Sequence, residues 1–174
     1  DVQHPVGAEI GVFGGDLSAR LLARDDLRLM MVDSWGDFDA SFHASGDFHS
    51  TMTRSQHEAY LAKTRNEVAF ATDRGTILRM KSVDAAKRVT EMLDFVFIDA
   101  DHPYEGCKAD IEAWFPLVRE GGLLCGHDYD NTDFPQWGVK RAVDEFAAAK
   151  GFKVELGENF TWFIRIPAQQ AIAA

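Results

Sequence analysis

The chain has 174 residues, with 28 acidic against 18 basic side chains and a formal net charge of −10. This length predicts one domain over residues 1–174, and the charge argues against a nucleic-acid phosphate backbone as the main partner. No apolar run is long enough to span a membrane, and Cys107 and Cys125 show no metal-ligand spacing, so we expect buried thiols, a reducing cytoplasm and no membrane partner.

The first half of the chain alternates short apolar runs with helical stretches. The patterns predict strands over residues 6–13, 27–32 and 76–80. They predict helices over residues 17–24, with Asp16 as a candidate cap, and over residues 55–72 and 84–93. Residues 34–52 show no regular period but carry aromatic side chains, which is typical of a lid over a ligand or of a loop packed down by its aromatics.

The second half continues this alternation and ends differently. We expect strands over residues 94–98 and 123–126, a helix over residues 104–118 closed by Gly121 and Gly122, and a helix over residues 139–149. Residues 152–156 and 161–166 form two last strands with no helix between them. The pattern predicts an α/β fold, with a doubly wound, mostly parallel Rossmann-like sheet and a C-terminal antiparallel strand.

A buried strand ends abruptly in polar residues at Asp99, Asp101 and His102. Ligands of open α/β sheets collect at the carboxyl ends of the strands, so we expect these side chains at the rim of a site. An imidazole titrates near neutral pH, which makes His102 the candidate general base. Asp101 would either orient that ring or cap the following helix.

A glycine turn follows the first strand in the pattern Glu9-x-Gly11-x-x-Gly14, and Asp33 ends the second strand. Glycines let backbone N–H groups approach a ligand closely, and an acid at Asp33 can bond the hydroxyls of a ribose. The alternative is a tight turn that Asp33 merely caps. The spacing is not Gly-x-Gly-x-x-Gly, so a dinucleotide is not the first choice.

Three longer motifs resemble those of a known enzyme family. The turn motif with Ser18, the run from Phe97 to Glu105 and the run from Gly121 to Tyr129 resemble class I S-adenosylmethionine-dependent methyltransferases, in the branch of small-molecule O-methyltransferases. The resemblance implies that S-adenosylmethionine is the cofactor. The implied cofactor-binding residues are Glu9, Gly11, Gly14, Asp33, Ser34, Trp35, Ser82, Val83 and Asp99.

Each part of the cofactor has implied neighbours in this set. Gly11 and Gly14 would lie under its methionine part, and Asp33 would hold its ribose. Ser82 and Val83 would flank the adenine, unless they are a helix cap and a core valine.

A cation site is the second implication. Asp99 ends the fourth strand, and His127 and Asp128 end the fifth, so adjacent parallel strands would bring these residues within reach of one ion. Oxygen ligands suit Mg²⁺, whereas a histidine ligand leaves open Mn²⁺, another divalent cation or no metal. In the resembled enzymes a histidine at the spacing of His102 serves as the base. Residues 131–137 follow as a candidate wall of the acceptor pocket.

The function that these features predict is metal-assisted O-methylation of a small-molecule hydroxyl. A non-catalytic cofactor-binding or partner-binding domain is the alternative, and a nicotinamide-dependent oxidoreductase is a weaker one because the glycine pattern is missing. The sequence leaves open the acceptor and the oligomeric state, a homo-oligomer included.

Overall fold

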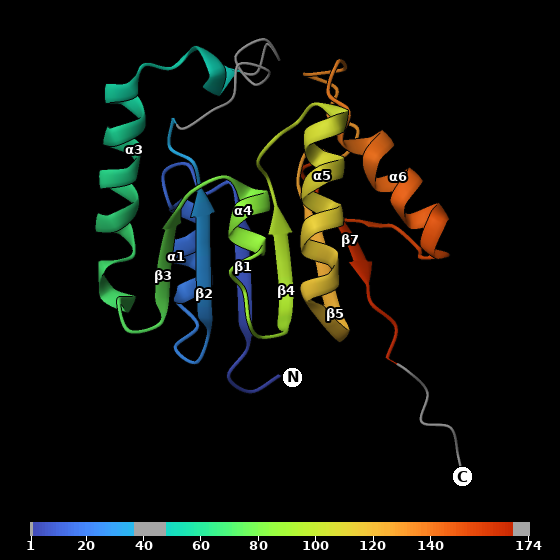
Figure 1. Ribbon diagram of the computed structural model, residues 1–174, viewed down its shortest axis with the longest axis horizontal. Coiled ribbons are helices and arrows are strands. Elements are labelled where there is room, and N and C mark those ends of the chain that lie inside the picture. The colour runs from blue at the N-terminus through green and yellow to red at the C-terminus, as the bar shows by residue number, and fades with distance from the viewer. Residues whose placement is uncertain (1, 37–47, 169–174) are drawn as a thin grey trace.

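Figure 1 presents a computed structural model, which describes residues 2–36 and 48–168. Its strands are β1 (Val6–Ile10), β2 (Arg28–Asp33), β3 (Gly75–Arg79), β4 (Leu93–Ile98), β5 (Val118–Gly126), β6 (Glu155–Leu156) and β7 (Trp162–Arg165). In the described residues they form one seven-stranded sheet in the order β3-β2-β1-β4-β5-β7-β6. Strands β1 to β5 pair in parallel, and β7 runs antiparallel to both β5 and β6. The predicted fold class is confirmed.

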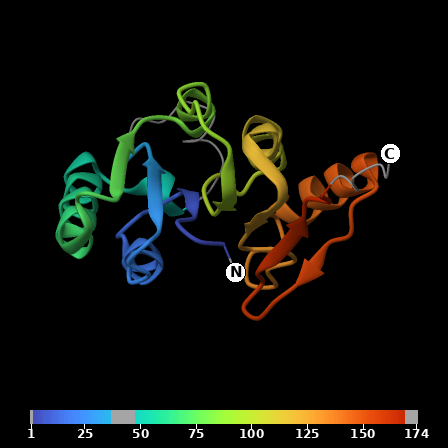
Figure 2. The ribbon, with the colours of Figure 1, turned by 90° about the horizontal axis from the view of Figure 1, so that it is seen from below.

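Helices cover both faces of this sheet (Figures 1 and 2). Their bounds are α1 (Asp16–Leu22), α3 (Arg54–Glu67), α4 (Ser82–Ala86), α5 (Tyr104–Trp114) and α6 (Val139–Lys150). Along β2, Leu29 and Met31 pack toward α1 and α3, whereas Val32 belongs to the apolar cluster of the other face, which also holds residues of α4, α5 and α6. Both faces of the central strands are therefore apolar, which explains their uninterrupted hydrophobic runs. None of the described helices has the length and apolar character needed to cross a membrane.

Several predicted boundaries were wrong. The cap of α1 is Gly15, in a left-handed conformation at φ 80°, and Asp16 is the first helical residue. The helix predicted over residues 84–93 is the short α4, which starts two residues earlier. The helix predicted over residues 104–118 ends at Trp114, because Pro116 breaks it, and both Gly121 and Gly122 lie inside β5.

Helix α3 starts where the sequence carries a capping box. The Thr53 backbone N–H donates to Oε1 of Gln56 at 2.8 Å, and the Gln56 N–H donates to the Thr53 hydroxyl at 3.4 Å. The helix ends at Glu67, and a short 3-10 turn over Ala69–Ala71 replaces the end of the predicted helix. Most of the expected lid, including Phe38, lies outside the described residues.

The carboxyl ends of the central strands meet at one edge of the sheet. Ile10 at the end of β1 pairs with Ile98 at the end of β4, which pairs with Gly126 at the end of β5. The chain runs from β1 outward through β2 and β3, and then returns to build β4 and β5 on the other side. The reversal lies between β1 and β4, which is the position where open α/β sheets bind ligands.

Candidate active site

A cavity of about 550 Å³ opens at this edge of the sheet. Its walls come from the turn after β1, the ends of β2 and β4, the start of α4 and the first half of α5. All nine residues implied as cofactor-binding line it: Glu9, Gly11, Gly14, Asp33, Ser34, Trp35, Ser82, Val83 and Asp99. Asp101 and His102 also line it, whereas His127 and Asp128 do not.

The floor of the cavity is the turn after β1. Gly11 has φ +86°, and a Cβ added there would overlap the backbone carbonyl of Asp99. The turn and the end of β4 can therefore lie this close only because residue 11 has no side chain.

Asp33 holds this turn in place. Its Oδ2 accepts hydrogen bonds from the backbone N–H groups of Val12 at 3.0 Å and Phe13 at 2.8 Å, and its Oδ1 accepts one from Trp35 at 2.8 Å. The Trp35 indole in turn donates to the Phe13 carbonyl at 2.9 Å. The turn-capping role considered for Asp33 is thus real. These bonds also orient the carboxylate at the cavity wall, where the remaining lone-pair position on Oδ1 is available to a ligand.

Glu9 points from β1 toward α1 and is 1 % exposed. It accepts a hydrogen bond from the hydroxyl of Ser18. Burial is the main reason that its pKa rises from 4.5 to about 8. The Ser18 hydrogen bond opposes this rise, and the charges of Asp99 and Asp33 add to it. At neutral pH Glu9 is therefore mostly a neutral carboxylic acid that links the first strand to the first helix.

The opposite end of the cavity lies between α4 and α5. Ser82 is the first residue of α4 but not its cap, which is Lys81. Its Oγ accepts a hydrogen bond from Nε1 of Trp114 at 2.8 Å. Val83 is 37 % exposed, so it is not the core valine of the alternative interpretation.

Asp110 joins this end of the cavity and was not singled out from the sequence. It lines the cavity from α5 and is only 4 % exposed. Its sequence signal is an acid on the helix face that also carries the buried Cys107, Ile111 and Trp114.

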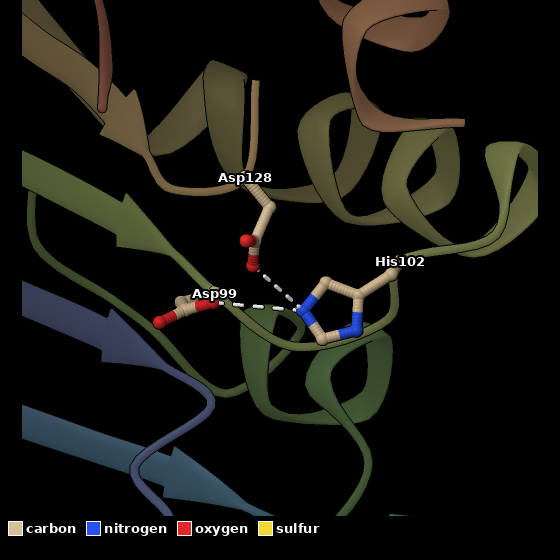
Figure 3. Close-up of side chains that lie close together, drawn as sticks. All are labelled: Asp99, His102 and Asp128. Atoms are coloured by element: carbon tan, nitrogen blue, oxygen red, sulfur yellow. Dashed lines mark ion pairs between the residues drawn. The ribbon is translucent and has the colours of Figure 1, made fainter. Parts of the chain in front are cut away.

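Asp99, His102 and Asp128 form a compact cluster beside the cavity (Figure 3). Nε2 of His102 lies 3.0 Å from Oδ2 of Asp128 and 3.7 Å from Oδ1 of Asp99. Burial raises the pKa of Asp128, but hydrogen bonds from His102, His127 and Asn131 outweigh it and hold the pKa well below its usual range. The cluster therefore keeps an ionised carboxylate in a largely enclosed position.

His127 lies at the edge of this cluster and not within it. Its Nδ1 is 3.2 Å from Oδ1 of Asp128, and its side chain is 32 % exposed. The hydrogen bond to Asp128 raises its pKa, against the effect of burial. The three donor atoms that lie within 4.8 Å of one another belong to Asp99, His102 and Asp128.

These three atoms fit one cation. With metal–ligand distances of about 2.1 Å, neighbouring ligand atoms of an octahedron lie about 3 Å apart. The 3.0 Å between His102 and Asp128 matches this spacing, and the 3.7 Å between His102 and Asp99 would have to shorten. Two carboxylate oxygens and an imidazole nitrogen suit a divalent ion such as Mn²⁺ as well as Mg²⁺.

The loop after β5 fixes His102 from a second direction. The indole of Trp137 stacks on the imidazole, and the N–H of Gly138 donates to the His102 carbonyl at 2.9 Å. The carboxyl of Asp101 lies against Gly106 of α5, where a Cβ would overlap it. Pro103, not Asp101, is the cap residue of α5.

A second cavity of about 430 Å³ lies on the outer side of this loop. Asp128 and Trp137 line it together with charged residues of α6, among them Lys140 and Arg141. Part of the expected wall over residues 131–137 therefore does border a cavity, adjacent to the cluster.

Solved structures with the same fold include several methyltransferases. NovP, an O-methyltransferase, is 17 % identical with a TM-score of 0.67 over 94 % of this chain and 72 % of its own. CalS11, a calicheamicin methyltransferase, is 16 % identical with a TM-score of 0.67, over 92 % and 72 %. PaMTH1 of Podospora anserina, solved with S-adenosylhomocysteine, is 16 % identical with a TM-score of 0.61, over 93 % and 71 %.

No curated protein matches the sequence. A family model described as a methyltransferase domain matches residues 8–129, from the middle of β1 to just beyond the Asp128 position. This match includes the glycine turn, Asp33 and all three residues of the cluster, and by it the chain belongs to the methyltransferase domain family.

Proposed function

We propose that this protein transfers a methyl group from S-adenosylmethionine to a hydroxyl oxygen of a small molecule, with the help of a divalent cation. The observation that carries the proposal is that one cavity joins the glycine turn and Asp33 to a cluster of a histidine and two aspartates. A cofactor lying along this cavity would have its reactive end beside groups that can bind and deprotonate an acceptor.

The chain's own residues supply the cofactor site. Gly11 and Gly14 present backbone to the methionine part, and Asp33 accepts hydrogen bonds from the ribose hydroxyls while it holds the turn. Ser34 and Trp35 line the cavity next to it. Ser82 and Val83 flank the adenine, and Val83 offers an exposed apolar surface for a flat ring to cover.

The acceptor side uses the cluster. Bound between Asp99 and Asp128, a divalent cation would lower the pKa of an acceptor hydroxyl and stabilise the alkoxide. Nε2 of His102 faces the same space. With a cation at Asp128 in place of its hydrogen bond, and provided that His102 is not itself a ligand, this nitrogen would take the proton from that hydroxyl. The loop that carries Trp137 excludes water from one face of the ring.

The charge of the molecule supports a small acceptor over a nucleic acid. The net charge is −10, and the cavity is bordered by carboxylates, including Asp33, Asp99 and Asp101. A polyphosphate backbone would be repelled by such a surface. The neighbouring CalS11 is a TDP-rhamnose 3′-O-methyltransferase, which makes sugar hydroxyls a reasonable first group of acceptors to screen.

Calorimetry with the unreactive cofactor product tests the first half of the proposal. S-adenosylhomocysteine should bind and NAD should not. The second half is tested by incubating the protein and Mn²⁺ with methyl-labelled S-adenosylmethionine and a panel of sugars, phenols and other hydroxyl compounds. Binding of NAD alone would contradict the cofactor assignment. Cofactor binding without transfer to any acceptor would favour a non-catalytic domain.

A further inference from the structure

Asp110 is a buried acid of the cavity to which the proposed methyl transfer gives no role. It projects from the middle of α5, and α5 packs beside α4 on one face of the sheet (Figures 1 and 2). It lines the same end of the cavity as Ser82 and Val83, although only 4 % of its surface is exposed. Buried carboxyl groups are costly unless hydrogen-bond donors reach them.

Ser82 is one such donor, and the direction of its hydrogen bond follows from its other partner. Its Oγ accepts the N–H of Trp114 at 2.8 Å, so its single proton is left to donate elsewhere. That proton goes to the carboxyl of Asp110. A line of hydrogen bonds from Trp114 through Ser82 therefore holds Asp110 at the cavity wall.

One hydroxyl does not satisfy a buried carboxylate, which offers about four lone-pair positions. Burial raises the pKa of Asp110 to about 7. The Ser82 hydrogen bond opposes this rise, and the charge of Asp101 adds to it. A further donor supplied from the cavity would therefore stabilise the ionised group.

The shape of this end suits a flat ring. Gly106 and Ala109 line it from α5 with almost no side chain, and Val83 lines it from α4 with an exposed apolar surface. A flat, largely apolar ring with one N–H donor on its edge would match both the walls and the acid.

We propose that Asp110 is the residue that selects the base of the cofactor. Its carboxyl accepts a hydrogen bond from the exocyclic amino group of adenine, and Ser82 holds the carboxyl in the orientation that this requires. This inference rests on the proposed function, because it takes the cavity to be the S-adenosylmethionine site. Asp110 thereby excludes nucleosides with a carbonyl oxygen at the same ring position, since two acceptors would then face each other.

The experiment compares two ligands that differ at position 6 of the ring and, as a consequence, in the proton on N1. S-adenosylhomocysteine carries the 6-amino group, and S-inosylhomocysteine carries a 6-oxo group in its place. Calorimetry on the wild-type protein should give a preference for the adenine compound of about 10- to 150-fold, the range for losing a hydrogen bond to a charged group. In Asp110→Asn the side-chain amide can donate to the 6-oxo group, so the ratio should fall to about 1 or below.

Asp84→Asn is the matched control. Asp84 borders the same end of the cavity, but its side chain is mostly exposed and pairs with Lys87 at 2.8 Å. This variant should keep the wild-type ratio. If Asp110→Asn does not fold, Ser82→Ala replaces it. Loss of the hydroxyl that holds the carboxyl should lower the ratio at least about threefold.

The outcomes separate this inference from the function on which it rests. If the wild-type protein binds neither compound, the proposed function fails. If it binds both equally, or if Asp110→Asn keeps the full preference, the cofactor site stands and the role of Asp110 is overturned. An equal fall of the ratio in Asp84→Asn also overturns it, because the effect would then follow from the charge of the cavity alone.

Discussion

The imidazole of His102 lies face to face with the indole of Trp137, with ring centroids 3.8 Å apart and 8° between the planes. The ring of Phe134 continues the stack at 4.1 Å and 9°. Asp128, which contacts the edge of the imidazole, belongs to the same segment between β5 and α6. One loop therefore fixes the ring of His102 through both its face and its edge.

Loss of this ring stack should reduce turnover without weakening cofactor binding. We expect Trp137→Ala to lower kcat by about 2- to 12-fold, because a stacked aromatic pair stabilises the observed ring orientation by about 0.5–1.5 kcal/mol. The Kd of S-adenosylhomocysteine should stay within about twofold, since Trp137 does not line the cofactor cavity. Trp137→Phe should recover most of the activity. A parallel loss of cofactor binding would instead indicate a structural role.

Removal of His102 should have a larger effect. If its imidazole takes the proton of the acceptor, His102→Ala should lower turnover by roughly 10²–10⁴-fold, with cofactor affinity nearly unchanged. The loss should shrink at high pH, where the acceptor ionises without help. Steady-state rates over a pH series measure this. Near-normal turnover at neutral pH would place the base elsewhere, with His127 as the next candidate.

The cation has a direct test that needs no acceptor. We expect Mn²⁺ to bind the wild-type protein, as measured by the loss of the free-ion signal in electron paramagnetic resonance. Once an acceptor is known, a chelator should also abolish methyl transfer. Asp128→Asn should weaken Mn²⁺ binding at least about tenfold, because one charged ligand of the cluster is lost.

His127→Ala and His102→Ala assign the third position of this cation site. His127 lies outside the group of donor atoms, so its removal should leave Mn²⁺ affinity within a few-fold. A strong loss in His127→Ala would favour the ligand set inferred from the sequence. A strong loss in His102→Ala would make His102 a ligand and contradict its role as base.

The sequence predicts the strand ends better than it predicts their surroundings. Asp33 and Asp99 are recognisable because a buried apolar run stops at each of them, and parallel strands bring such ends to one edge. The contact of His102 with Trp137 joins residues far apart in the chain through an irregular loop. The hydrophobic periodicity of helices and strands carries no information about a contact between two loop residues, so sequence patterns cannot predict it.

Two further misses have local causes. Gly121 and Gly122 have the pattern of a helix stop, but Pro116 ends the helix before them, and β4 and β5 shift in register across the glycine segment. Asp110 carries the signal of an acid on a buried helix face. That signal shows that the carboxyl needs a hydrogen-bond partner. It does not show which cavity the acid borders, because this depends on how α5 packs against α4.

Asp33 should be sensitive to substitution for two reasons. It fixes the backbone of the glycine turn, and we propose that it binds the ribose. Asp33→Ala should weaken S-adenosylhomocysteine binding by about 1.5–3 kcal/mol, the cost of losing charge-assisted hydrogen bonds. Calorimetry measures the affinity, and circular dichroism checks the fold. Unchanged affinity in a folded variant would limit Asp33 to capping the turn.

The buried carboxyl of Glu9 should lower the free energy of unfolding as pH rises, and one substitution should remove this effect. Burial raises the pKa of Glu9 in the folded protein from 4.5 to about 8. Below about pH 4.5 the carboxyl is protonated in both the folded and the unfolded state. Between these two values the folded state keeps a proton that the unfolded state releases, so the free energy of unfolding falls as pH rises. The slope should approach about 1.4 kcal/mol per pH unit, and above about pH 8 the cost is complete.

Glu9→Gln keeps an oxygen that can accept the hydrogen bond from Ser18 but has no proton to release. Urea denaturation at several pH values between about 5 and 8 should therefore show the variant gaining stability over the wild type as pH rises. Other titrating groups, such as Asp110, contribute to both curves and largely cancel in the difference. Two parallel curves would mean that Glu9 stays ionised in the folded protein, and that burial does not control its charge.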